Sequence, residues 1–228
     1  MAKMTNLQLV NAILKNIGEP TISALTSMTT IQTQAYDALN DVIYDLSMDA
    51  MWRPLETIGT FTMTTGTNTY TEASDLMHED IFSFRTPDNT TSIACLNPQD
   101  WDSAYPAGIG TATTGYPTAI LRYEGKFHLN KYPSATQNGK VIWYRYWKTP
   151  TTLSTTTTGS TTNCWFPEGT DSSVLVNLAT FKVLTYKNAP EAQSYYQKVY
   201  GQGGSMGRMM KRFANDAGKL QVRVTEPM

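Results

Sequence analysis

Both ends of the chain carry apolar residues at the spacing of α-helices. Residues 5–8 have the spacing of a capping box, and apolar residues follow every three or four positions until Gly18. A second capping-box spacing at residues 29–32 opens a longer apolar pattern that ends before Pro54. The sequence therefore predicts two helices within its first 54 residues.

The helical pattern returns near the C-terminus. Asp171 begins an apolar pattern that reaches Asn188, and Pro190 lies where a last helix would start. Four glycines within residues 201–207 interrupt that last helix, so we expect either a break or a close backbone contact there. Each helix has one apolar stripe to bury, and the helices of the two ends are therefore expected to pack together.

The middle of the chain alternates apolar and polar residues with the period of β-strands. Residues 56–63 form the first such stretch, and Glu124-Gly125 has the composition of a hairpin turn between two others. A tract of threonine, serine and glycine at 149–163 has no apolar period and predicts a mobile or externally stabilised loop. Further strands are expected at 69–71, 81–85, 92–96, 119–123, 126–130 and 140–148.

These patterns predict an α+β fold. It consists of an antiparallel-type helical bundle built from both chain ends, an inserted β-rich domain and an extended C-terminal tail. The expected bounds are residues 1–54 for the N-terminal helices, 55–167 for the β-domain, 168–213 for the C-terminal helices and 214–228 for the tail.

Composition narrows the functional classes. Charged residues make up 16% of the 228 residues and the net charge is −1, which disfavours a DNA-binding protein. About 35 threonines favour strands and suggest a surface that packs against other subunits. No apolar run is long enough to cross a membrane, and the N-terminus lacks the pattern of a signal peptide. Cys95 and Cys164 are expected to be reduced, with pairing left open.

Catalytic motifs are hard to find. His78-Glu79-Asp80 is interpreted as a solvated loop, and His128 as a half-buried residue of a sheet. Phosphate-binding glycine loops are absent from the sequence. We therefore predict no enzyme, no cofactor and no metal site. The alternative is a tail-associated cell-wall glycan hydrolase, which would need two carboxylates flanking a groove.

Two patterns suggest contacts with partners. Asp37, Asp41, Asp45 and Asp49 recur every four residues on the second predicted helix, where repulsion between like charges is unfavourable. They form a solvated face, a subunit interface or a channel wall. The tail after residue 213 alternates apolar and basic residues, so it is either a solvating terminus or an unpaired strand that completes a sheet on a partner.

An ordered series of short motifs resembles tail tubular protein A and the wider group of phage head-to-tail adaptors. Residues 10–25 are similar to the opening of that family, in which a helix runs into Ile-Gly-Glu-Pro. The following motifs occur in the order of the adaptor group: residues 52–56, 65–70, 96–101, 115–118, 129–133, 144–147 and 166–167. The resemblance covers most of residues 5–200.

The resemblance implies a structural virion protein at the head-tail junction, made in the host cytoplasm. Copies of it, usually twelve, would form a ring that joins the portal protein to the tail nozzle or tail tube. DNA would pass through the ring without sequence-specific binding, and no membrane would be involved. The tail would reach the portal through basic and apolar residues, namely Arg212, Phe213, Lys219, Leu220, Val222, Arg223 and Val224.

Overall fold

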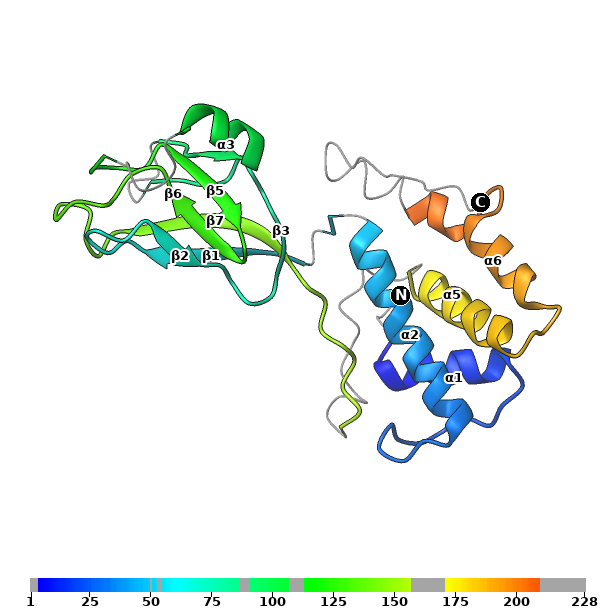
Figure 1. The fold of residues 1–228 in the computed structure, drawn as a ribbon. Helices are drawn as coiled ribbons and strands as arrows, with labels where there is room; N and C mark the ends of the chain where they lie inside the picture. The colour runs from blue at the N-terminus through cyan, green and yellow to red at the C-terminus, as the bar shows by residue number, and fades with distance from the viewer. Residues whose placement is uncertain are drawn as a thin grey trace. The chain divides into compact units, whose positions relative to one another are not determined.

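The computed structural model describes residues 4–49, 51–52, 55–86, 91–106, 113–156 and 171–209. The chain divides into two compact units, shown in Figure 1. A helical unit combines Met1–Pro54 with Pro150–Met228, and a β unit comprises Leu55–Thr149. The mixture of helices and two sheets confirms the α+β class. The expected end of the β-domain at residue 167 lies outside the described residues.

The helical unit is organised around one central helix. This helix, α5, packs against α1, α2 and α6, and Figure 1 shows it between α2 and α6. Its buried residues, among them Val174, Leu175 and Ala179, provide the apolar surface for these contacts. The helices are α1 (Asn6–Asn16), α2 (Thr30–Asp49), α5 (Asp171–Tyr186) and α6 (Ala192–Tyr200).

The first two helices begin where their capping residues predict. The backbone N–H of Thr5 donates to Oε1 of Gln8 at 2.9 Å, and the N–H of Gln8 donates to Oγ1 of Thr5 at 3.2 Å. At the start of α2, the N–H of Thr29 donates to Oε1 of Gln32 at 2.8 Å. These three bonds satisfy donors that a helix terminus leaves without a partner. The predicted starts of α1 and α2 are therefore confirmed.

The glycine-rich region breaks the last helix. α6 ends at Tyr200 with Gly201 as its C-cap, and a short helical segment follows at residues 205–209. Gly203 has a φ of +74°, which favours glycine. A Cβ atom on Gly204 would lie 2.2 Å from the carbonyl oxygen of Val199, so only glycine fits there. The break that the four glycines predicted is thus confirmed.

Within its described residues, the β unit contains two sheets and one short helix. All strand pairs are antiparallel except β4 and β5, which are parallel. Helix α3 covers Pro98–Ala104. One sheet has the order β1 (Glu56–Thr62), β7 (Val141–Lys148) and β3 (Leu76–Glu79); the other has the order β2 (Thr69–Thr71), β6 (Lys126–Leu129), β5 (Ala119–Tyr123) and β4 (Ala94–Leu96).

Aromatic side chains form the centre of the β unit. The fully buried ring of Phe127 lies 4.8 Å from that of Tyr144, 5.3 Å from that of Phe84 and 5.8 Å from that of Phe61, between centroids. These residues come from strands of both sheets and from the segment after β3. Aromatic pairs at such distances add stabilisation beyond the burial of their area. The core therefore ties the two sheets together.

The prediction of a strand at 81–85 is wrong. The strand ends earlier, as β3 at Glu79, and the chain then turns. Asp80 makes this turn, because its Oδ1 accepts the N–H of Phe82 at 3.1 Å and its carbonyl accepts the N–H of Ser83 at 2.9 Å. His78 and Glu79 consequently lie on a strand, which corrects the interpretation of residues 78–80 as a solvated loop.

The first part of the threonine-rich tract is anchored on α2. Leu153 is buried, and its N–H donates to Oδ1 of Asn40 at 2.8 Å. The hydroxyl of Tyr36 donates to the carbonyl of the same leucine. One buried apolar side chain and two hydrogen bonds at Leu153 therefore hold this part of the tract on α2, although its sequence lacks an apolar period. The remainder of the tract lies outside the described residues.

Candidate interaction surfaces

The aspartates of α2 form an exposed surface, which we call the acidic face of α2. It comprises Asp37, Asp41 and Asp45, and the side chains of the latter two are 68% and 60% exposed. Tyr44 and Met48 lie on the same exposed side and are each about half exposed. The side chain of the fourth aspartate, Asp49, lies outside the described residues. The surface combines acidic groups with an apolar strip.

One lysine of α5 partly neutralises this surface. Nζ of Lys182 lies 2.7 Å from Oδ2 of Asp45 and 3.9 Å from Oδ2 of Asp41. Such exposed ion pairs contribute about 0–1 kcal/mol each. Within the described residues, Asp37 has no cation within 4.0 Å, so the acidic face keeps a surplus of negative charge. Negative charge without a partner on its own subunit suits a contact with a basic surface.

Helix α6 and the residues after it carry positive charge and aromatic rings. Nζ of Lys198 lies 3.9 Å from the ring centroid of Tyr195, a cation–π distance. Tyr200 is exposed, as is Arg208, whose Nη1 donates to the carbonyl of Gly203 at 2.6 Å. We call Tyr195 and Lys198, three residues apart on one side of α6, the basic face of α6. Since α5 lies between α2 and α6, the helical unit carries opposite charge on two separate helices.

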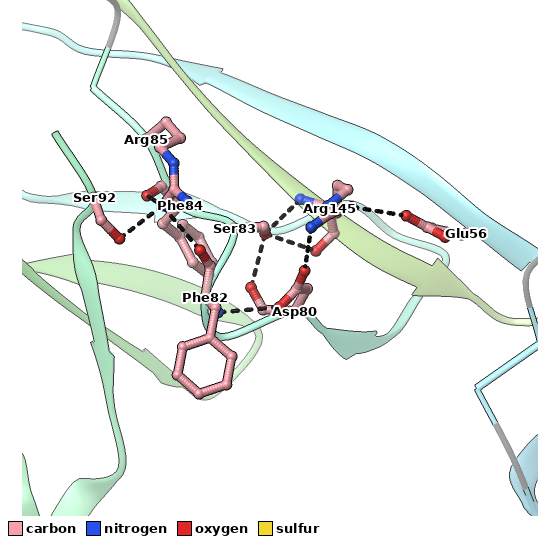
Figure 2. A network of polar contacts seen from close by, with 8 residues as sticks. All are labelled: Glu56, Asp80, Phe82, Ser83, Phe84, Arg85, Ser92 and Arg145. Carbon is pink, nitrogen blue, oxygen red and sulfur yellow. Dashed lines mark hydrogen bonds and ion pairs between the residues drawn. The ribbon is translucent and has the colours of Figure 1, made fainter. Parts of the chain in front are cut away.

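The β unit presents an exposed aromatic side chain on a tightly bonded turn (Figure 2). Phe82 is 75% exposed, and its carbonyl accepts a bond of 2.9 Å from Nη1 of Arg85. Oγ of Ser83 donates to the carbonyl of Asp80 and accepts the N–H of Arg145, both at 2.7 Å. The backbone around Phe82 is therefore held by side chains on both sides.

Arg145 joins this turn to β1. Its Nη2 lies 3.0 Å from Oδ2 of Asp80, and its Nη1 lies 3.4 Å from Oε1 of Glu56, as Figure 2 shows. Sequence reasoning missed this group because it placed Phe82 within a strand. The Asp-x-Phe-Ser order, with a carboxylate two residues before the aromatic ring, was the available signal for a turn.

The carboxylates that approach each other in the β unit are bound to an arginine. Nη1 of Arg122 donates to Oε2 of Glu79 at 2.8 Å, and its Nη2 donates to Oε1 of Glu72 at 3.0 Å. The hydrogen bond to Glu72 raises the pKa of Arg122 above its usual value. Both glutamates thus hold an ion pair between strands, whereas a glycosidase needs carboxylates that flank a substrate.

His128 and Cys95 of the β unit lie among residues that give them a structural role. His128 is half-buried on β6, as expected, and its Nδ1 lies 3.4 Å from Oγ1 of Thr69. Cys95 has a free thiol, and burial raises its pKa to about 12, so it is a weak nucleophile at neutral pH. Within the part of the chain that the structure describes, no group of three possible metal ligands occurs. Cys164 lies outside that part.

The proposed portal-binding residues of the tail, from Arg212 to Val224, also lie outside the described residues. No helix among those described is long and apolar enough to span a membrane. A search of curated proteins finds no match to this chain. The family model described as SU10 adaptor protein matches residues 4–224, which is nearly the whole chain. The chain therefore belongs to the SU10 adaptor protein family, which confirms the resemblance to phage head-to-tail adaptors.

Proposed function

We propose that copies of this chain form a closed ring at the head-tail junction of the virion, seated between the portal protein and the tail nozzle or tube. The ring of twelve copies that the resemblance implies would enclose a channel, through which DNA passes without sequence-specific binding. The role is structural and requires no catalysis. The match of the adaptor family over residues 4–224 is the observation that carries this proposal.

A ring requires two different faces on each subunit, because one face must contact a different face of the next copy. The acidic face of α2 and the basic face of α6 are two such surfaces, with α5 between them. Their charges are complementary, and each includes an aromatic side chain, the exposed Tyr44 beside the acidic face and the half-buried Tyr195 in the basic face. Aromatic residues are enriched in the centres of protein interfaces. These observations support a contact between α2 of one copy and α6 of the next, rather than an acidic channel wall.

The C-terminal segment is proposed to attach the ring to the portal. Three apolar residues, Leu220, Val222 and Val224, would enter grooves on the portal surface. The basic residues Arg212, Lys219 and Arg223 would meet acidic groups, with Phe213 at the start of the segment. The alternation in the sequence supports an extended conformation for these contacts.

Neutralising the acidic face is expected to weaken ring assembly. A variant with Asp37→Asn, Asp41→Asn and Asp45→Asn loses three exposed interface charges at about 0.5 kcal/mol each. It should therefore need about a tenfold higher concentration to decorate portal rings. Removing like charges at four-residue spacing should leave helix stability unchanged or slightly raised. Negative-stain electron microscopy of portal mixed with the variant measures the decoration.

The matched control changes two exposed acids of the β unit, Asp102→Asn and Glu124→Gln. This control should decorate portals at the wild-type concentration. If the triple variant behaved like the control, the acidic face would lie outside the contact between copies, and a position facing the channel would be favoured instead.

A further inference from the structure

Strand β1 is a long edge strand. In the order β1-β7-β3 it pairs with β7 alone, through seven residue pairs in continuous register. The strands at the other edges of the two sheets, β3, β2 and β4, contain only four, three and three residues. Short edge strands offer little backbone for pairing, whereas a strand of seven residues offers a complete template.

The hydrogen bonds around β7 show which groups of β1 point outward. The N–H of Met63 donates to the carbonyl of Lys140, and on the other side of β7 the carbonyl of Arg145 accepts the N–H of Asp80. Backbone groups alternate in direction along an antiparallel ladder. Residues 57, 59 and 61 therefore bond to β7, and the N–H and C=O groups of residues 58, 60 and 62 point away from the sheet.

Residues 57–62 of this strand, beyond the charged Glu56 at its start, lack the features that usually protect an edge. Residues 57–62 contain no charge and no proline, and their pairing with β7 has no bulge. Ile58 is 64% exposed on the outer face. Within the described residues, no backbone hydrogen bond reaches the outward groups of residues 58, 60 and 62. Natural proteins protect such edges, so an uncovered one indicates a strand supplied from elsewhere.

The C-terminal tail has the length and pattern of a matching strand. Residues 219–225 alternate Leu220, Val222 and Val224 with polar and basic residues, over the same seven positions as β1. About 19 residues follow Met209, and they span about 60 Å when extended at about 3.3 Å per residue. The tail is therefore long enough to leave its own subunit.

Charge also favours this segment. Within the described residues, Glu56 at the start of β1 shares the cation Arg145 with Asp80, so its carboxylate is only partly neutralised. Lys219 and Arg223 occupy the polar side of the tail strand. When these two residues face outward toward Glu56, the apolar residues of the tail face inward, beside the side chains of the β-unit core.

We propose that the outward edge of β1 docks the C-terminal strand, residues 219–225, of a second copy of this chain. The assignment rests on the proposed function and adds a second partner for the segment proposed to bind the portal. Before a subunit meets the portal, its tail strand lies on the edge of another copy and covers it. Contact with the portal then releases the strand from that edge.

Hydrogen exchange in the full-length chain tests the docking at single amides. At concentrations where sedimentation shows association, the amides of residues 58, 60 and 62 should exchange at least tenfold more slowly than in a Val222→Pro variant. Proline removes a backbone donor from the tail strand and leaves the described fold untouched. The matched control Val222→Ile keeps a β-branched residue and should behave like the wild type.

A second variant tests the other side of the contact. Thr60→Pro removes one outward N–H of β1, while the bonds of residues 59 and 61 to β7 remain. This variant should be monomeric at concentrations where the wild type associates, with thermal unfolding showing that it is folded. If Thr60→Pro does not fold, the docking is tested by hydrogen exchange in the wild type and in Val222→Pro alone. Equal exchange of amides 58, 60 and 62 in these two proteins would overturn the docking.

Different results would contradict the proposed function and the docking at the edge of β1. Thr60→Pro keeps an intact tail, so it should decorate portal rings at least as well as the wild type. Protected β1 amides in a wild-type protein that did not decorate portals would leave the edge docking intact and contradict the proposed function. Portal decoration by a wild-type protein with unprotected β1 amides would contradict only the edge docking.

Discussion

Deletion of residues 214–228 is expected to abolish attachment to the portal while leaving a folded monomer with unchanged helix content. The deletion begins five residues after Met209, the last residue that the structure describes, and keeps α1, α2, α5 and α6 whole. Three apolar side chains that become buried contribute about 1.5–3 kcal/mol each, whereas exposed ion pairs contribute about 0–1 kcal/mol. The apolar residues should therefore dominate the affinity, and added salt should weaken binding only modestly. Co-sedimentation with purified portal rings measures the loss.

Two full-length variants separate the apolar and charged contributions. Replacing Leu220, Val222 and Val224 by serine should remove most of the binding. Replacing Lys219 and Arg223 by glutamine removes at most two exposed ion pairs, or about 2 kcal/mol, and should reduce it by about thirtyfold at most. A truncated chain that decorated portals at wild-type concentrations would contradict the role of the tail, and attachment would then come from the helical unit.

Truncating Phe127 to alanine is expected to cost about 3–5 kcal/mol of the stability of the β unit. The side chain is fully buried, and it contacts the rings of Phe61, Phe84 and Tyr144. The substitution leaves a cavity between the two sheets. The lost stability is a large part of the unfolding free energy of about 5–15 kcal/mol that is typical of whole domains. Urea unfolding followed by near-ultraviolet circular dichroism reports the transition of the aromatic core.

Tyr123→Ala provides the matched control on an adjacent strand. Its side chain is 52% exposed at the end of β5, so the substitution should change the unfolding free energy by about 0.5 kcal/mol or less. A loss below about 1 kcal/mol for Phe127→Ala would contradict the position of that ring at the centre of the core.

The elements that were predicted correctly depend on local interactions. The capping box of α1 involves residues three positions apart, so its signal is complete within one turn of sequence. β7 alternates buried and exposed residues along its length, and its expected range of 140–148 agrees with Val141–Lys148. The hairpin turn at Glu124-Gly125 is confirmed by positive φ values of 51° and 71°.

The elements that were missed depend on distant partners or on overlooked caps. β3 lacks a clear alternation and exists because it pairs with β7, about 70 residues away in the sequence. Hydrogen bonds to Asp80 end this strand. The apolar residues at 81–85 nevertheless predicted that a strand continued there. For α3 the signal was present, because Asn97 caps the helix and Pro98 occupies its first turn.

The interaction surfaces were predicted in part. The four-residue spacing of the aspartates placed Asp37, Asp41 and Asp45 on one exposed side of α2, as the structure shows. Lys182 could not be inferred, because it reaches Asp45 from a helix 137 residues away. The open edge of β1 has no signal of its own in the sequence, since edge position follows from the order of strands.

The most direct test of the ring is a cryo-electron microscopy reconstruction of purified portal mixed with the full-length chain. The proposed function predicts a closed ring of copies on the portal, with α2 of each copy against α6 of the next and an open axial channel. Isolated copies on the portal without contacts between neighbours, or a portal left bare at saturating concentrations, would contradict it.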